Sequence, residues 1–171
     1  LKQSGPYKCG HYIGGEWSDH RRSNLERLNP ADSREVACLW NSGGFTEAYA
    51  AIDAAQAAFP VWAGTPAPER ARMFWRATEI LKRRAKELCD AMIAEAGKDW
   101  KGAAGEVAKT IKILEYCAGM GTRIEYVGRP AEQRGVTTFV LKQPLGVVSL
   151  ITPFNFPVAV PAWKIGPALV A

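Results

Sequence analysis

Residues 144–157, with the sequence PLGVVSLITPFNFP, decide the fold of this chain. Within them, Val147–Ile151 is a short, nearly all-apolar run between Gly146 and Pro153. Such a run is typical of a strand that is buried on both faces of a parallel sheet. A helical pattern begins after Pro157, and a buried strand followed by a helix is typical of α/β proteins. The sequence therefore predicts an α/β fold.

The predicted strand and helix do not complete a sheet by themselves. A parallel strand followed by a crossover helix needs a second parallel strand to return to. No apolar run of that kind follows the helical pattern before Ala171. We therefore expect the chain to be truncated after the first strand and helix of a doubly wound sheet.

One amide side chain lies at the carboxyl end of the predicted strand. Asn155 stands among apolar residues in the ITPFNFP block, at the edge where ligands of open α/β sheets bind. An asparagine there can donate N–H hydrogen bonds to a developing oxyanion without adding negative charge. The spacing is equally compatible with a turn in which Asn155 satisfies local backbone groups. Lys164 is either a positive charge near this site or a surface lysine whose stem covers apolar neighbours.

The residues before 144 predict a small sheet, a helical layer and an exposed strand. Gly14-Gly15 and Asn29-Pro30 divide residues 1–45 into short strands, and Val136–Leu141 suits a sheet edge or an arm. The predicted helices are Thr46 (as the cap) to Pro60, Pro68 to Glu95 before Gly97, and Ala103 to Ala118, with a linker over Trp62–Pro68.

Apolar periodicity predicts the buried face of each helix, and it places Arg70 and Arg72 on the side that faces water. The apolar positions in chain order are Ala48, Ile52, Ala55, Ala58 and Phe59, then Met73, Phe74, Ala77, Leu81, Leu88 and Met92, then Val107, Ile111 and Leu114.

Composition excludes several classes of protein. The 171 residues are 47% hydrophobic and 23% charged, which is typical of a globular domain and not of a disordered chain. No apolar run reaches the roughly 18 residues of a membrane span, and no apolar signal segment opens the chain. The cysteines lack metal-binding spacing, so we expect reduced thiols, no metal site and a cytoplasmic protein. These cysteines are Cys9, Cys38, Cys89 and Cys117.

The net charge of +5 raises nucleic acid as a partner, but the distribution of charge argues against it. The tight basic runs are Arg21-Arg22 and Lys82–Arg84. The second run lies between Glu79 and Glu87, which is typical of a solvated helix face. We expect neither nucleic acid nor a membrane among the partners.

Other polar groups have ordinary structural interpretations. Gly119–Ile124 partly matches a dinucleotide glycine motif, but it follows a helix, so a helix end is the better interpretation. His11 and His20 are expected to be exposed. Three glutamates are interpreted as solvated helix-surface carboxylates, namely Glu95, Glu106 and Glu115.

Several segments of the chain match one enzyme family in their order. The specific block is Ile151-Thr152-Pro153-Phe154-Asn155-Phe156-Pro157, preceded by Pro144–Val148 and followed by Trp163–Leu169. Supporting segments are GGEW at 14–17, NPA at 29–31, PERA at 68–71, EAGK at 95–98 and GEV at 105–107. Together they closely resemble the N-terminal part of the NAD(P)-dependent aldehyde dehydrogenase superfamily, over nearly the whole chain.

The resemblance implies a fold with a cofactor domain, a catalytic domain and a strand arm for oligomerisation. On this basis, residues 1–134 are expected to form the first part of the cofactor-binding domain. Residues 135–144 would be the arm strand, and the edge of Val136–Gln143 would pair with another subunit of a homo-oligomer. Residues 145–171 would be the first strand and helix of an incomplete, Rossmann-like sheet.

The resemblance also implies NAD or NADP as cofactor and assigns site residues. Asn155 matches the oxyanion-hole asparagine of the family, and Lys164 matches a lysine near its proton-relay region. The stretch that lines the nicotinamide-ribose side of the cofactor cleft is matched by Ile151, Thr152, Pro153, Phe154 and Asn155. The family's catalytic cysteine and glutamate fall in regions after Ala171, so the segment alone is expected to be inactive.

The implied reaction is oxidation of a small aldehyde or semialdehyde to the carboxylic acid through a cysteine thioester. Phe154 is more typical of the CoA-acylating branch, whereas Trp163-Lys164 is more typical of the hydrolytic branch, so both stay open. The alternative function is a catalytically inactive module that binds a partner or oligomerises through its arm.

Overall fold

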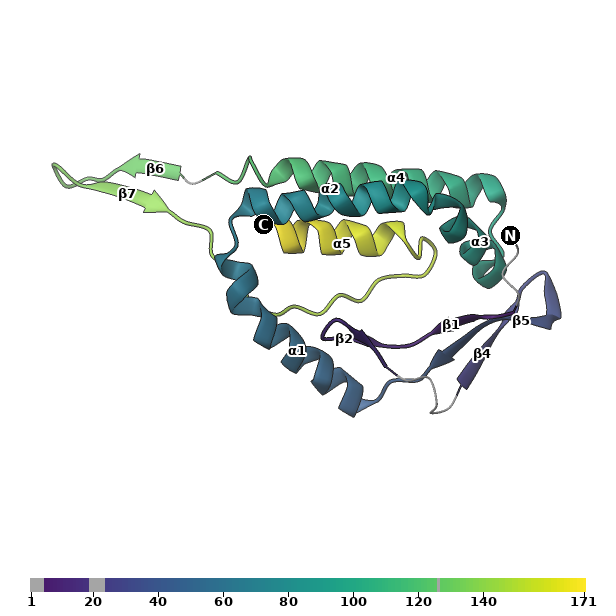
Figure 1. Ribbon diagram of the computed structural model, residues 1–171. Coiled ribbons are helices and arrows are strands. Elements are labelled where there is room, and N and C mark those ends of the chain that lie inside the picture. Colours follow the sequence, from purple (N-terminus) through teal and green to yellow (C-terminus); the bar gives the residue numbers. More distant parts are fainter. Residues whose placement is uncertain (1–4, 19–23, 126) are drawn as a thin grey trace.

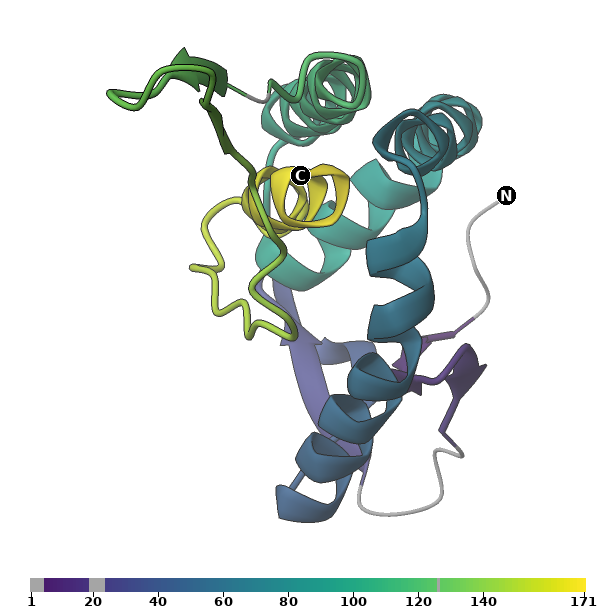
Figure 2. The same cartoon turned by 90° about the vertical axis from the view of Figure 1, so that its left-hand side faces the viewer.

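Three helices lie side by side along most of the molecule, with a small sheet at one end and a projecting hairpin at the other (Figure 1). The computed structural model describes residues 5–18, 24–125 and 127–171. Viewed end-on, the three helices form a triangle in which each contacts the other two (Figure 2). The helices of the described residues are α1 (Phe45–Gly64), α2 (Ala67–Arg83), α3 (Ala85–Ala96), α4 (Trp100–Met120) and α5 (Ala159–Val170), and the triangle consists of α2, α4 and α5.

The short strands and both turns predicted for residues 1–45 are confirmed. At the Asn29-Pro30 turn, Asn29 Oδ1 accepts a hydrogen bond from the Ala31 N–H at 2.9 Å. The Gly14-Gly15 turn has positive φ angles of 62° and 88°, which glycine adopts without strain. The strands are β1 (Tyr7–Cys9), β2 (Tyr12–Ile13), β3 (Glu16–Trp17), β4 (Asn24–Asn29) and β5 (Asp32–Asn41), with one sheet in the order β1-β5-β4 and a separate β2-β3 hairpin.

The first helix differs from its prediction at both ends and along its face. Its cap is Gly44, whose N–H donates to Glu47 Oε2 at 2.7 Å, so Thr46 is not the cap. The helix continues through Pro60 to Gly64, and this shortens the predicted linker. Because α1 buries none of its residues, water can satisfy the carbonyl that the proline leaves free. The predicted apolar stripe is exposed except at Phe59, which is half-buried.

The predicted long helix is two helices. The chain departs from helical geometry at Arg84, where φ is −101° and ψ is 13°, and α3 then continues in a new direction. This bend lets Cys89 and Met92 pack against the first half of α4, while Phe74 packs against its second half. The predicted end at Gly97 is confirmed, with a left-handed φ of 67°.

The core between the helices forms two clusters, in which most side chains are small or medium-sized and Phe74 is the one aromatic residue within the described part of the chain. Most predicted core positions on α2, α3 and α4 are buried or half-buried, but Met73 is half-exposed. Arg70, which was expected to face water, is buried. The clusters are Phe74, Leu114, Cys117, Ala118, Ala162 and Val170, and Cys89, Met92, Ala103 and Val107.

The segment Val147–Ile151, predicted as a buried strand, is not paired as a strand in the structure. No other strand of the described residues lies beside it, and a strand forms only when a neighbour takes its backbone hydrogen bonds. The helix predicted after Pro157 is confirmed as α5. β6 (Val127–Pro130) and β7 (Thr137–Val140) form the projecting antiparallel hairpin, which includes residues on both sides of position 134.

Because α2 approaches the end of α4 closely, we expect a single methyl group added at Gly121 to lower stability. A Cβ at Gly121 would lie 2.5 Å from Ala71 Cβ and 2.6 Å from the Ala67 carbonyl oxygen. We expect Gly121→Ala to lower the free energy of unfolding by about 1–3 kcal/mol through overpacking.

Chemical denaturation measures this change, and Gly105→Ala is the matched control. Gly105 lies within the same helix, α4, and a methyl group added there would meet no atom within 4 Å, so alanine should raise stability by up to about 1 kcal/mol. Equal effects of the two substitutions would contradict the close packing of α2 on α4.

Candidate functional site

The predicted site residues other than Lys164 lie on one mostly exposed segment that leads into α5. Ile151 and Phe154 are 95% and 91% exposed, and Pro153 and Asn155 are exposed too, while Thr152 is half-buried. Within the described residues, no hydrogen bond engages the Asn155 side chain. The structure therefore leaves the Asn155 amide exposed, next to residues 151–154 in the chain.

The start of α5 is held by a carboxylate from another helix. Val158, the residue before the helix, supplies no side-chain cap. Instead, Oε1 of Glu106 in α4 accepts hydrogen bonds from the N–H groups of Val158 at 2.8 Å and Ala159 at 3.0 Å. A negative charge at this position satisfies free N–H groups and interacts favourably with the helix dipole.

Glu106 is therefore not the solvated carboxylate that we predicted. It is 2% exposed, and its other oxygen accepts a hydrogen bond from Lys98 Nζ in the turn before α4. Burial alone would raise its pKa, but the bonds from Lys98, Val158 and Ala159 together outweigh burial, and the pKa of Glu106 is lowered.

A sequence signal for the burial of Glu106 existed. It stands three residues after Ala103 and four before Thr110, which are both buried on the inner stripe of α4. A charged residue in a buried stripe implies a partner, because an unpaired buried charge is very unfavourable. The other two glutamates behave as predicted or nearly so: Glu95 is exposed, and Glu115 is paired with Lys82 on the surface.

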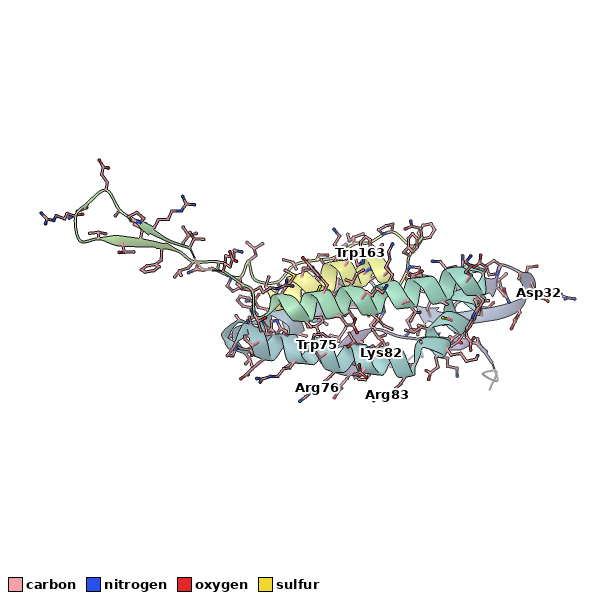
Figure 3. The ribbon with its side chains drawn as sticks, turned by 90° about the horizontal axis from the view of Figure 1, so that it is seen from above. Asp32, Trp75, Arg76, Lys82, Arg83 and Trp163 are labelled. Atoms are coloured by element: carbon pink, nitrogen blue, oxygen red, sulfur yellow. The ribbon has the colours of Figure 1, made fainter. Side chains whose placement is uncertain are left out.

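Two lysines also surround Phe156, the neighbour of Asn155. Lys98 Nζ lies 4.5 Å from the centre of the Phe156 ring, and Lys109 Nζ lies 5.6 Å from it. Lys109 is also 5.2 Å from the ring of Trp163, which is labelled on α5 in Figure 3. These cation–π contacts tie the residue after Asn155 to α4 and to the turn before it.

The other end of α5 is held by the buried Arg70 of α2. Its Nη2 donates to the carbonyl oxygens of Val170 at 3.0 Å and Ala171 at 2.8 Å, and its Nη1 donates to Thr65 O at 2.5 Å. The guanidinium donates to carbonyls near the carboxyl-terminal end of α5, where the helix dipole favours a positive charge. Arg70 is thus buried because it binds α5, which its place in the sequence of α2 did not indicate.

Lys164 lies on the exposed side of α5, between Trp163 and Ile165. Within the described part of the chain, no ion pair or hydrogen bond joins it to Asn155 or to another side chain. Its place near the site therefore remains a prediction.

The remaining candidates do not form a second site. Gly119 and Met120 are the last residues of α4 and Gly121 is its C-cap, which confirms a helix end for this motif. His11 is half-buried, so the prediction that it is exposed is wrong. Lys82–Arg84 is exposed as expected, whereas His20 and Arg21-Arg22 lie outside the described residues. Arg76 and Arg83 point away from α4 and α5 along the outer side of α2 (Figure 3).

The cysteines are free, as predicted, and three of them are buried. Burial and a contact with Cys9 Sγ at 3.4 Å raise the pKa of Cys38 to about 12, and burial raises the pKa of Cys89 and of Cys117. These three are poor nucleophiles, because the thiolate is the reactive form. In the ranges that the structure describes, no three His, Cys, Asp or Glu residues gather in a way that could hold a metal ion.

Comparison with known protein families identifies the family of this chain. The sequence model described as "Aldehyde dehydrogenase family" matches residues 17–171. The chain belongs to the aldehyde dehydrogenase family. A relative from Haloferax volcanii, named alpha-ketoglutarate semialdehyde dehydrogenase, is 38% identical over 162 residues, which are 94% of this chain and 34% of the relative.

Solved structures of this family share the fold. An NADP-dependent enzyme of Escherichia coli has a TM-score of 0.91 and 34% identity, over 96% of this chain and 34% of that one. A Sinorhizobium meliloti protein solved with NAD has a TM-score of 0.89 and 30% identity, over 98% of this chain and 34% of that one. The chain therefore spans about a third of the length of these aldehyde dehydrogenase relatives. Among the described residues, no helix combines the length and apolar character needed to cross a membrane.

The hydrogen bonds of Arg70 predict a large effect of its removal. Arg70→Met keeps much of the stem but leaves the carbonyls of Thr65, Val170 and Ala171 without their donor. We expect a loss of about 2–3 kcal/mol in the free energy of unfolding, measured by chemical denaturation. The exposed Arg72→Met should change it by less than about 0.5 kcal/mol, and a similar loss in both variants would contradict the role of Arg70.

Proposed function

We propose that this chain is part of an NAD(P)-dependent aldehyde dehydrogenase in which Asn155 stabilises the oxyanion formed from the aldehyde. The observation that carries the proposal is the free, exposed amide of Asn155 between an uncovered segment and the anchored start of α5. Membership of the aldehyde dehydrogenase family supports the same reaction class.

The amide of Asn155 suits this role chemically. When a nucleophile attacks an aldehyde carbonyl, negative charge develops on the oxygen, and an N–H donor in place before the reaction stabilises that charge. Aspartate would have the same shape but would repel the oxyanion. Lys164, on the exposed side of α5, is proposed to add positive charge near the same surface.

The residues before Asn155 fit the nicotinamide-ribose part of NAD or NADP. Ile151, Pro153 and Phe154 expose apolar surface that a nicotinamide ring can cover, and Thr152 offers a hydroxyl for the ribose. The bound cofactor supplies a hydride acceptor. The E. coli enzyme is described as NADP-dependent and the S. meliloti protein was solved with NAD, so both cofactors are supported equally.

The proposed substrate is a small aldehyde or semialdehyde, which is oxidised to the carboxylic acid through a cysteine thioester. A relative named alpha-ketoglutarate semialdehyde dehydrogenase supports this substrate class. We propose that the nucleophilic cysteine and the glutamate base come from another part of the complete enzyme. Cys38, Cys89 and Cys117 are buried, and the exposed Cys9 contacts Cys38 Sγ at 3.4 Å and not Asn155.

Substitution of Asn155 tests the proposal. In the complete enzyme that carries this chain, Asn155→Ala and Asn155→Asp should lower kcat about 10²- to 10³-fold, because an oxyanion donor is lost. Initial rates with a semialdehyde and NAD or NADP measure the change. The control Gln56→Ala removes an exposed amide from α1 and should leave kcat unchanged. Asn155→Ala with wild-type kcat would contradict the assigned role.

We further propose that the β6-β7 hairpin holds subunits together as a homo-oligomer. All of its paired residues are exposed, and each strand pairs only with the other among the described residues, which leaves backbone groups on the outer edges free. Apolar side chains of Phe139, Val140 and Leu141 are exposed there as well.

A double substitution in the hairpin tests this assembly. Val140→Asp with Leu141→Asp should reduce the particle mass in light scattering to that of a smaller species, because like charges would meet at the interface. Phe45→Asp, a change of an exposed aromatic residue at the start of α1, is the control and should keep the wild-type mass. An unchanged mass of the hairpin variant would show that subunits do not associate through this strand pair.

A further inference from the structure

Asn155 is followed in the chain by residues that specific contacts hold in place. The segment that precedes it is exposed from Leu145 onward apart from Gly146 and Thr152, and it belongs to no sheet of the described residues. The residues that follow it are the ones that are fixed. Asn155 is one residue from Phe156 and three from Val158, so its backbone can move no further from Val158 than about 10 Å, the reach of three residues.

One side chain, Glu106, forms the polar part of this anchor. Its Oε1 accepts the N–H groups of both Val158 and Ala159, at 2.8 and 3.0 Å. Two hydrogen bonds to one oxygen fix the direction in which the chain enters α5, and that direction decides where Asn155 lies relative to α4.

The charge of Glu106 depends in turn on Lys98. The Lys98 side chain is 19% exposed, it pairs with the other carboxylate oxygen, and it lies over the ring of Phe156. It comes directly after Gly97, whose left-handed φ of 67° turns the chain between α3 and α4. A single lysine thus contacts the carboxylate that holds residues 158–159 and the aromatic ring beside Asn155.

We propose that Glu106, kept ionised by Lys98, is a positioning residue that sets the place of Asn155 in the oxyanion site. This inference rests on the function proposed for Asn155. Glu106 does not touch the reacting atoms. It acts through the first turn of α5, and its loss moves or loosens the amide donor while the carbonyl of the substrate still binds through other groups.

The first experiment measures the anchor without measuring activity. In Glu106→Gln the shape is kept but the charge is lost, and the amide NH₂ faces the donors of Lys98 or of α5. We expect hydrogen exchange at the amides of residues 158–160 to accelerate at least tenfold, measured by mass spectrometry on the complete enzyme. Glu115→Gln is the matched control. Glu115 lies on α4, as Glu106 does, but it pairs with Lys82 of α2 and not with α5. Equal exchange in the two variants overturns the inference.

The second experiment separates positioning from simple stabilisation. A positioning role predicts that Glu106→Gln lowers kcat at least tenfold with a change in KM of less than about threefold, in the temperature range where the variant is fully folded. A purely structural role predicts that the variant melts at a lower temperature but has the kcat of the wild type at temperatures where it is folded. That second result overturns the inference.

The pH dependence of kcat and of amide protection also distinguishes a positioning role from a structural one. The groups that face Glu106 are Lys98 from the turn before α4 and two backbone N–H groups of α5, with Lys109 one turn along α4 above the Phe156 ring. A carboxylate with a lowered pKa holds α5 at neutral pH and releases it as pH falls through that pKa. Lys98→Met removes the main charge that opposes burial, so both kcat and the protection of residues 158–160 should be lost at a higher pH than in the wild type.

The outcomes distinguish this inference from the proposed function. Wild-type kcat in Asn155→Ala contradicts the oxyanion role itself, whatever Glu106 does. A large loss of kcat in Asn155→Ala, together with unchanged exchange and kcat in Glu106→Gln, retains the oxyanion role and overturns the positioning role of Glu106 alone.

Discussion

Two buried charges of opposite sign hold α5 at its two ends. Glu106 from α4 binds the N–H groups at the start of the helix, and Arg70 from α2 binds the carbonyls at its end. Each charge matches the sign that the helix dipole favours at that end, and each forms hydrogen bonds with backbone groups there. Asn155, the proposed oxyanion donor, stands four residues before Ala159, the first residue of this helix, so we propose that its placement depends on how α5 is held.

These buried charges differ from the ion pairs on the molecular surface. Pairs such as Lys86 with Asp90 and Arg84 with Glu87 join neighbouring turns of one helix and are exposed, where such pairs contribute little to stability. Glu106 is surrounded by Lys98 and two backbone donors, which compensates for the unfavourable transfer of its charge from water. The same burial makes the arrangement sensitive to loss of one partner, because a charge would then stay buried without compensation.

The close packing around α5 is a second condition for the site. At Gly166, a side chain would bring its Cβ within 2.7 Å of Cys117 Sγ, so a glycine is needed where α5 crosses α4. Small residues let the helices approach, and the close approach brings Glu106 within reach of α5. The uncovered segment 151–155 and the β6-β7 hairpin lie outside this packed layer, as Figures 1 and 2 show. The rigid part of the chain thus carries the exposed parts to which we assign cofactor binding and association.

Local sequence determined much of this protein. Gly14-Gly15, Asn29-Pro30 and Gly97 mark turns or ends through their own backbone preferences, and the ITPFNFP block with its flanking segments identifies the aldehyde dehydrogenase family. Only the tertiary structure decided the roles of Glu106 and Arg70. Each was predicted to face water as a charged residue on a helix, and each is buried because its partner lies 52 or 100 residues away in the chain. The same reason explains the unpaired segment Val147–Ile151. Its apolar sequence favours a strand, but a strand is a property of two segments together, and periodicity within one segment cannot supply its neighbour.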